Sequence, residues 1–195
     1  MKYTILLDSS NTSLTVGLAS NDSLLDSISY EAWPCQSEHM IPELDTLLGK
    51  YSVDKKDIES VIVAYGPGSY TGVRISITIA KVLATCLPVK VYAISSLHCL
   101  KDNDKPSICL INARSGRSYF GVYKGKEILE NDQILTNDLV KEYIQKHPDY
   151  SVCGNTTYLG IEGVNSNIAQ QLLSLKDKRY LVENPLGLKP VYMKD

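Results

Sequence analysis

Apolar residues in the first half of the chain fall into short runs that suit strands and longer segments that suit helices. The run Val61-Ile62-Val63-Ala64-Tyr65 has the length and composition of a buried strand. In the segment 37–50, apolar residues recur at helical spacing, which predicts an amphipathic helix packed on a sheet. The segment 71–86 predicts a second helix, whose apolar residues face nearly every direction. Such a helix is usually buried on more than one side, so a subunit interface and a central core position both remain open.

Polar side chains on the 71–86 helix are confined to a narrow stripe. Its members follow one another at steps of four, three and four, and they are Arg74, Thr78, Lys81 and Thr85. The basic residues of this stripe suit pairing with an acidic partner helix, which is compatible with the interface interpretation.

A loop with three glycines lies between the strand at 61–65 and the helix at 71–86. Its residues are Gly66, Pro67, Gly68, Ser69, Tyr70, Thr71 and Gly72. Such a loop lets backbone N–H groups face an anion, or lets another segment approach closely. No lysine follows Gly72, as a P-loop requires, and the third glycine comes one residue too late for a dinucleotide fingerprint. A tight turn and a site for an anion or a partner therefore both remain open.

The chain matches itself weakly when it is shifted by 104 residues. Ile5-Leu6-Leu7-Asp8 then falls near Cys109-Leu110-Ile111-Asn112, and Gly17-Leu18 falls on Gly121-Val122. Each copy predicts a small antiparallel meander of three strands, and in the second half helical segments follow at 137–146 and 166–175. Two hairpins that are similar by chance are the alternative to duplication.

Duplication predicts an α/β fold made of two lobes of βββαβα type. We expect an N-terminal lobe at residues 1–103, with the glycine loop and both interface helices, and a smaller C-terminal lobe at residues 104–195. Two such lobes facing each other are the plan of the superfamily of actin, sugar kinases and heat-shock chaperones. In that plan the turn after the first strand of each lobe reaches toward a nucleotide in the cleft, and Asp8 and Asn112 occupy these turns.

Composition and charge exclude several classes of function. The chain has 195 residues, of which 44% are hydrophobic and 22% charged, and its formal net charge is −2. It therefore lacks the global basic field of a nucleic-acid-binding protein. No apolar run approaches the roughly 20 residues of a membrane span and no signal peptide is evident, so we expect a cytoplasmic protein. The three histidines show no metal-binding spacing, and no catalytic triad is found.

Four segments together resemble the TsaB (YeaZ) family. They are Asp8-Ser9-Ser10, the glycine loop with Val73-Arg74-Ile75, Ile111-Asn112-Ala113-Arg114, and Pro190-Val191-Tyr192-Met193. The likeness is strong over residues 1–125 and loose beyond them, and the glycine loop with its arginine is its most specific part. The resemblance implies an actin-like two-lobe fold. It also implies a role in making threonylcarbamoyladenosine, the modified base beside the anticodon of tRNAs that read ANN codons.

The same resemblance implies partners and a surface that binds them. Family members bind and activate the transferase TsaD without catalysis of their own, the ATPase TsaE joins them, and contact with tRNA is indirect. The helices that match 37–50 and 71–86 would contact TsaD or a second copy of the chain, with ATP or ADP possible at the partner interface. The expected partner-binding residues are Met40, Leu44, Leu47, Arg74, Ile77, Thr78 and Lys81. A degenerate nucleotide cleft is expected at Asp8, Ser9, Ser10 and Asn112.

The chain departs from the family pattern at several positions. Tyr70, Ser76 and Asn112 stand where members usually have Phe, Gly and Asp, and the loss of a charge at Asn112 weakens the case for a nucleotide in the cleft. Ser96 and Leu100 stand where TsaD carries metal-binding histidines, which favours the non-catalytic partner over the transferase. The alternative function is a small independent ATPase or kinase of the same fold that uses Asp8 with magnesium.

Overall fold

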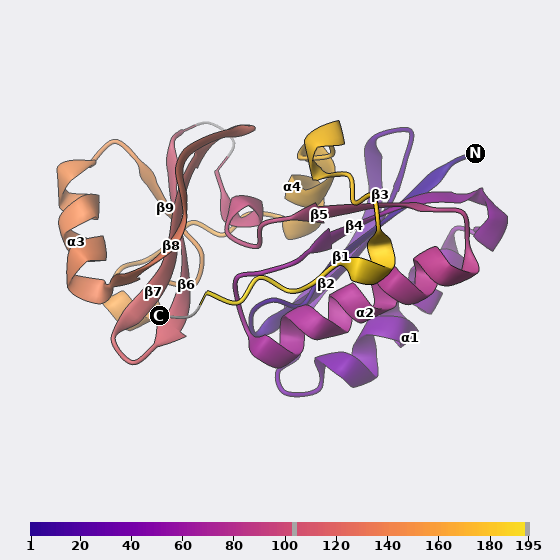
Figure 1. Cartoon of the computed structure of the whole chain (residues 1–195), viewed down its shortest axis with the longest axis horizontal. Helices are drawn as coiled ribbons and strands as arrows, with labels where there is room; N and C mark the ends of the chain where they lie inside the picture. Colours follow the sequence, from indigo (N-terminus) through magenta and orange to yellow (C-terminus); the bar gives the residue numbers. More distant parts are fainter. Residues whose placement is uncertain (103–104, 194–195) are drawn as a thin grey trace.

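Two β-sheets stand side by side and give the molecule two lobes (Figure 1). This computed structural model describes residues 1–102 and 105–193. The first sheet has the order β3-β2-β1-β4-β5 and the second has the order β8-β7-β6-β9. The strands of the first sheet are β1 (Tyr3–Asp8), β2 (Ser13–Ser20), β3 (Ser23–Glu31), β4 (Ile58–Ala64) and β5 (Lys90–Ile94). Those of the second are β6 (Ser107–Arg114), β7 (Arg117–Lys124), β8 (Glu127–Thr136) and β9 (Ser151–Cys153).

Each sheet begins with the antiparallel meander that the repeat predicts. β2 and β7 occupy equivalent positions at an offset of 104 residues (117 minus 13), and β1 and β6 begin at the same offset. In both sheets, a later strand then pairs in parallel with the first strand of the meander: β4 pairs with β1, and β9 pairs with β6. The α/β fold with two duplicated lobes is therefore confirmed.

Helices cover both faces of the first sheet. α1 (Gln36–Lys50) and α2 (Tyr70–Cys86) lie on one face, and α4 (Ile168–Ser174) packs on the other (Figure 1). Because β1 and β4 are buried on both faces, their sequences are nearly continuous apolar runs instead of alternating ones. The helices predicted at 37–50 and 71–86 are confirmed as α1 and α2.

The second sheet is covered more sparsely. α3 (Asn137–Lys146) packs on β7 and β8, on the side that faces away from the first lobe (Figure 1). Leu97, which follows β5, packs with Ile111 and Tyr123 on the side that faces the first lobe. The two lobes are also joined by hydrogen bonds, since Ser95 Oγ donates to Asp132 Oδ2 over 2.5 Å.

The end of the chain returns to the first lobe, which differs from the expected division. α4 and the segment after it were expected in the smaller C-terminal lobe, but Ala169, Leu172 and Leu173 pack against the first sheet. The first sheet offers α4 a wide apolar face, which is why the helix lies there and not on the short β9. The expected boundary itself, between residues 103 and 104, lies outside the described residues. Within the described residues, no helix has the length and apolar character needed to cross a membrane.

Candidate functional site

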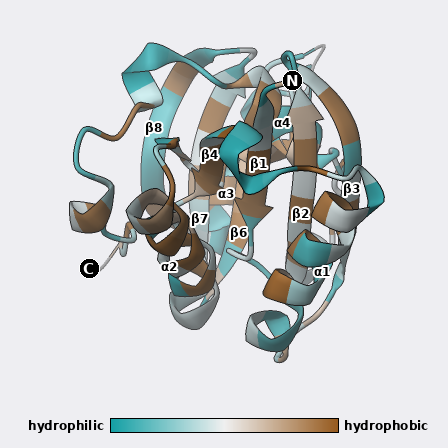
Figure 2. Ribbon diagram, turned by 90° about the vertical axis from the view of Figure 1, so that its right-hand side faces the viewer, coloured by the Kyte–Doolittle hydropathy of each residue, from teal (hydrophilic) through white to brown (hydrophobic). Residues whose placement is uncertain are grey.

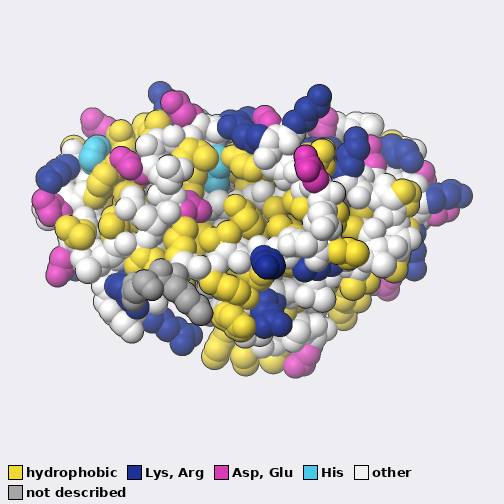
Figure 3. Space-filling model, viewed as in Figure 1, with side chains coloured by type: hydrophobic (Ala, Val, Ile, Leu, Met, Phe, Trp, Pro, Cys, Tyr) yellow, Lys and Arg dark blue, Asp and Glu magenta, His cyan; other side chains and the backbone are white. Residues whose placement is uncertain are grey.

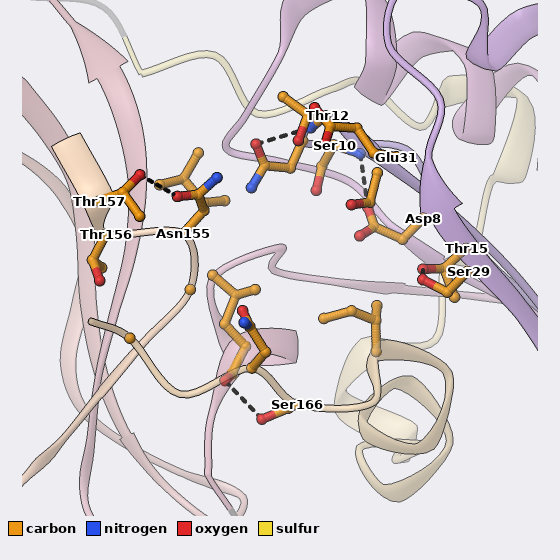
Figure 4. A pocket seen from close by; sticks show the side chains of 18 of the residues that line it. Asp8, Ser10, Thr12, Thr15, Ser29, Glu31, Asn155, Thr156, Thr157 and Ser166 are labelled. Atoms are coloured by element: carbon orange, nitrogen blue, oxygen red, sulfur yellow. Dashed lines mark hydrogen bonds between the residues drawn. The ribbon is translucent and has the colours of Figure 1, made fainter. Parts of the chain in front are cut away.

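A cavity of about 540 Å³ opens between the two lobes (Figure 4). The first lobe supplies the end of β1, the turn that follows it and the neighbouring strands, and the second supplies the loop after β9. Most of the lining side chains are hydroxyls and amides. The lining residues are Asp8, Ser10, Asn11, Thr12, Ser13, Thr15, Ser29, Glu31, Leu100, Ile111, Gly154, Asn155, Thr156, Thr157, Glu162, Gly163, Asn165, Ser166 and Ile168.

Asp8 stands where the sequence analysis expected it, at the end of β1 on the cavity wall. Its side chain is buried, and the backbone N–H of Ser10 donates to Asp8 Oδ1 over 2.8 Å. Burial raises the pKa of Asp8 because it penalises the charged carboxylate, and the hydrogen bond from Ser10 opposes this effect. The carboxylate thus serves partly as the acceptor that closes the turn after β1.

Asn112 is one of two expected cleft residues that do not line the cavity, and Ser9 is the other. Asn112 is exposed, and its side-chain oxygen accepts a hydrogen bond from the N–H of Arg114 over 2.8 Å. The reason is a one-residue slip in strand pairing: Asp8 pairs with Thr15, whereas Tyr119, the repeat equivalent of Thr15, pairs with Ile111. A slip of one residue turns a side chain to the other face of a sheet. Ile111, an apolar residue, therefore occupies the place that the sequence analysis gave to Asn112.

The opposite wall of the cavity was not predicted from the sequence. Asn155, Thr156 and Thr157 follow β9, and Glu162 and Ser166 belong to the same irregular loop (Figure 4). These residues form no periodic pattern and no motif, so the sequence carries no signal that brings them toward Asp8. Among the described residues that line the cavity there are three carboxylates and no lysine or arginine. The wall therefore lacks the cationic side chains that usually bind a phosphate group.

The glycine loop is a closely packed turn. Three of its N–H groups already have acceptors: Gly66 donates to Ser96 Oγ over 3.0 Å, Ser69 donates to the carbonyl oxygen of Ser10 over 2.7 Å, and Gly72 donates to Ser69 Oγ over 3.3 Å. A Cβ atom at Gly68 would collide with the carbonyl oxygen of Ser10, and one at Gly72 with that of Ser9. The glycines therefore let the loop lie directly on the turn after β1.

Ser9 and Ser69 fix the start of α2 on this loop. Ser69 caps the helix, because its Oγ accepts a hydrogen bond from the N–H of Gly72 over 3.3 Å. Ser9 Oγ donates to the carbonyl oxygen of Gly72 over 2.7 Å. Ser9 was expected in the nucleotide cleft, but it is buried here and faces the glycine loop. Its role in this structure is to hold α2 in place.

Four of the expected partner-binding residues lie in the core of the first lobe. Met40, Leu44, Leu47 and Ile77 are all buried in one cluster with the central strands. On α1 the apolar stripe that was expected to meet a partner packs on the helix's own sheet, and Ile77 on α2 does the same. The structure therefore contradicts the expectation that these four residues contact a partner.

The remaining members of the expected face lie on the outer side of α2. Arg74 and Thr78 are exposed, and Lys81 is half-buried. Beside them lie apolar residues that were not among the expected partner contacts: Ile75 and Ile79 are half-buried and pack partly on the core cluster, and Val82 is 55% exposed. Figure 2 shows α2 as hydrophobic along most of its length. Because α2 is apolar nearly all round, only the narrow polar stripe of Arg74, Thr78, Lys81 and Thr85 marks its outer side in the sequence.

Metal ligands do not gather in the part of the chain that the structure describes. No group of three or more His, Cys, Asp or Glu side chains lies close enough to hold an ion there. Ser96 stands at one of the two positions where TsaD was expected to carry a metal-binding histidine. Its hydroxyl oxygen accepts the hydrogen bond from the N–H of Gly66.

The two duplicated sheets, the inter-lobe cavity and the glycine loop define an actin-like α/β protein. The family model described as "TsaD: tRNA N6-adenosine threonylcarbamoyltransferase" matches residues 31–171. The chain is 31% identical over 164 residues to "tRNA threonylcarbamoyladenosine biosynthesis protein TsaB" of Bacillus subtilis, a match that covers 80% of this chain and 72% of that protein. The chain belongs to the TsaB (YeaZ) family.

Further comparisons agree with this assignment. A protein of the same name from Buchnera aphidicola subsp. Schizaphis graminum is 33% identical over 121 residues, which cover 55% of each chain. The solved structure "YeaZ from Pseudomonas aeruginosa" superposes with a TM-score of 0.81 at 23% identity and covers 99% of this chain and 100% of that one. This likeness shows that the whole described fold is shared.

Proposed function

We propose that this chain is a non-catalytic subunit in tRNA threonylcarbamoyladenosine biosynthesis that binds and activates TsaD. TsaD would transfer the threonylcarbamoyl group to the adenosine beside the anticodon, TsaE would join the two proteins, and this subunit would contact tRNA only indirectly. The pathway is that of the relatives, whose names place them in threonylcarbamoyladenosine biosynthesis. The match to a TsaD family model supports a shared ancestry of the two partners.

The observation that carries this proposal is the outer surface of α2. Val82 is 55% exposed, with half-buried Ile75 and Ile79 on the same helix. Full burial of an exposed side chain of this size contributes about 1.5–3 kcal/mol, so covering the part of Val82 that is still exposed favours association. Arg74 and Thr78 add polar groups that can fix the register of a partner helix.

The glycine loop gives this surface a fixed position. Ser9, Ser69 and the glycines hold the first turn of α2 against the turn after β1. A surface that is held in place before binding costs less entropy to dock. The proposed role of the chain is therefore to present a rigid helix to TsaD. An ATP or ADP molecule at that interface stays a prediction from the family resemblance.

The test is to place a charge on the exposed side of α2. In Val82→Glu, a carboxylate would be buried at the interface without a partner, so we expect affinity for TsaD to fall at least about tenfold while the free chain stays folded. Leu139→Glu on α3 is the matched control, because Leu139 is 50% exposed on the other lobe. Light scattering after size-exclusion chromatography, with and without TsaD, measures both complex formation and any homodimer. Wild-type affinity in Val82→Glu would overturn the proposed surface.

The second candidate function is the independent ATPase or kinase, and the position of Asp8 on the cavity wall favours it. A magnesium ion bound to Asp8 would have to supply the positive charge that the lining side chains lack. Failure of the wild-type chain to bind TsaD, together with ATP turnover by the chain alone, would favour this alternative over the subunit role.

A further inference from the structure

The C-terminal segment of the chain, residues 181–193, is bound to the first lobe along its whole length. The backbone N–H of Val182 donates to the carbonyl oxygen of Val91 over 2.9 Å, so the segment begins with a backbone hydrogen bond to the edge strand β5. The turn at Pro185–Gly187 then lies against α2, and Leu188 packs on the core cluster of the lobe. Figure 1 shows this segment in yellow, crossing in front of α2 toward the space between the lobes.

The segment ends on the glycine loop. The N–H of Val191 donates to the carbonyl oxygen of Tyr65 over 2.9 Å. Gly66 has a φ of +108°, and a Cβ atom at that position would lie 2.6 Å from the carbonyl oxygen of Val191. Residue 66 is therefore glycine for two reasons, because its backbone conformation suits glycine and because the C-terminal segment passes so close. The Pro190-Val191-Tyr192-Met193 motif is thus part of the glycine-loop structure.

Tyr192 extends this contact onto the first turn of α2. Its ring stacks on the ring of Tyr70, with centroids 4.7 Å apart and planes inclined by 22°. Arg74 Nη1 donates to the hydroxyl of Tyr70 over 3.0 Å, and the guanidinium lies 5.4 Å from the centre of the Tyr70 ring. The three side chains form a row, which we call the Tyr192–Tyr70–Arg74 row.

The row remains open to solvent although it is ordered by these contacts. Tyr70 is 59% exposed and Tyr192 is 37% exposed. Within the described residues, no ion pair joins Arg74 to an acidic side chain. Figure 3 shows hydrophobic side chains gathered around the start of α2, with basic side chains beside them. Exposed aromatic rings next to an arginine are the composition of binding hot spots.

We propose that the Tyr192–Tyr70–Arg74 row is part of the surface that binds TsaD, so that the C-terminal segment is a functional piece of the interface. This inference rests on the proposed function. The row continues the exposed side of α2, and Arg74 calls for a carboxylate or a helix C-terminus on the partner. Tyr192 is the positioning residue: without its ring, Tyr70 has a free face, and both Tyr70 and Arg74 can adopt other rotamers before binding.

The experiment measures affinity for TsaD by calorimetry in two variants of Tyr192. Tyr192→Ala removes the stacked ring and is expected to weaken binding at least about tenfold. Tyr192→Phe keeps the ring and is expected to bind within about threefold of wild type. Leu186→Ala is the matched control, because Leu186 lies on the same segment, is exposed, and is not part of the row.

Hydrogen exchange of the free chain gives a second readout that needs no partner. Tyr192→Ala should increase exchange at the amides of the first turn of α2 and leave those of α3 unchanged. If wild type binds TsaD and Tyr192→Ala binds equally well, the inference is overturned while the proposed function stands. If wild type fails to bind TsaD, the proposed function is overturned and the inference falls with it.

Discussion

The two lobes begin with nearly the same three strands and then use them differently. In the first lobe, the meander has helices on both faces and two further parallel strands, β4 and β5. In the second, the meander is joined by the three-residue β9 and covered by α3 on its outer side, while the segment after β5 packs on its inner side. The comparison teaches that strand positions can persist in a duplicated unit while the helices that cover them are redistributed.

Two equivalent glycines show this change at atomic scale. A Cβ atom at Gly17 in β2 would lie 2.9 Å from the Cβ of Ala169, so this glycine makes room for α4. At Gly121, its equivalent in β7, a Cβ atom would lie 2.7 Å from the hydroxyl of Tyr123 and 2.8 Å from the carboxylate of Asp132. One glycine admits a helix and the other admits a pair of polar side chains. The same residue in the repeat therefore serves a different neighbour in each lobe.

The largest expected effect comes from removing the apolar contact of α4 with the first sheet. Leu172 is fully buried there, so Leu172→Ala should lower the free energy of unfolding by about 2–5 kcal/mol. Leu139→Ala, on the exposed side of α3, should change it by less than about 0.5 kcal/mol. Urea denaturation measures both variants. A loss below about 1 kcal/mol in Leu172→Ala would mean that α4 is not needed by the first lobe.

A smaller effect is expected at the junction of the lobes, where His98 is buried. Its ring stacks on the ring of Tyr123, with centroids 4.1 Å apart. The ring nitrogen Nε2 lies 2.9 Å from the carbonyl oxygen of Gly125, and Nδ1 lies 3.4 Å from the hydroxyl of Tyr180. Burial lowers the pKa of His98 from 6.5 to about 4, and the positive charges of Lys101 and Arg179 act in the same direction.

The sign of the pH dependence follows from this lowered pKa. The unfolded chain binds a proton at His98 more readily than the folded chain, so the stabilisation is present above pH 6.5 and is lost as the pH falls toward 4. The loss is at most about 3 kcal/mol, at 1.36 kcal/mol per pKa unit. Denaturation at pH 7 and at pH 4.5 should differ less in His98→Gln than in wild type. An equal difference in both would show that another group controls the acid sensitivity of the junction.

The smallest of the three effects is expected at Gly17. Gly17→Ala places a methyl group against Ala169 and Leu6, and overpacking of this kind costs about 1–3 kcal/mol. The equivalent change, Gly121→Ala, meets the ends of two side chains. These ends can shift more than a Cβ atom that is fixed to the backbone, so the cost of this change should be lower. Thermal unfolding of the two variants compares them directly, and a larger loss in Gly121→Ala would reverse this assignment of the tighter contact.

The sequence predicted the fold more fully than the site. Strand periodicity and the 104-residue repeat were sufficient for the two meanders, and apolar spacing was sufficient for α1 and α2. The expected partner face was wrong in part, since Leu44 and Ile77 are core residues. A stripe of apolar residues says that a helix packs on something, but it does not distinguish a helix's own sheet from a partner.

The cavity wall was predicted on one side only. Asp8 follows a clear strand and could be placed at its end, whereas Asn112 was misplaced because strand pairing slips by one residue in the second hairpin. Nothing in the local sequence announces that slip. The loop from Asn155 to Ser166 was missed because its path depends on tertiary contacts, such as the bond from Ser166 Oγ to the carbonyl oxygen of Lys101.

The turn after β1 faces the cavity on one side and the glycine loop on the other. Toward the loop it offers mainly carbonyl oxygens, from Ser9 and Ser10, and every amino acid possesses that group. Toward the cavity it offers side chains, which differ from one amino acid to the next. Over evolutionary time, mutations at the cavity-facing positions of this turn can therefore alter what the cavity recognises while α2 keeps its place. Descendants of one ancestral lobe can in this way change the side chains that face the cavity and still keep the contact between this turn and the glycine loop.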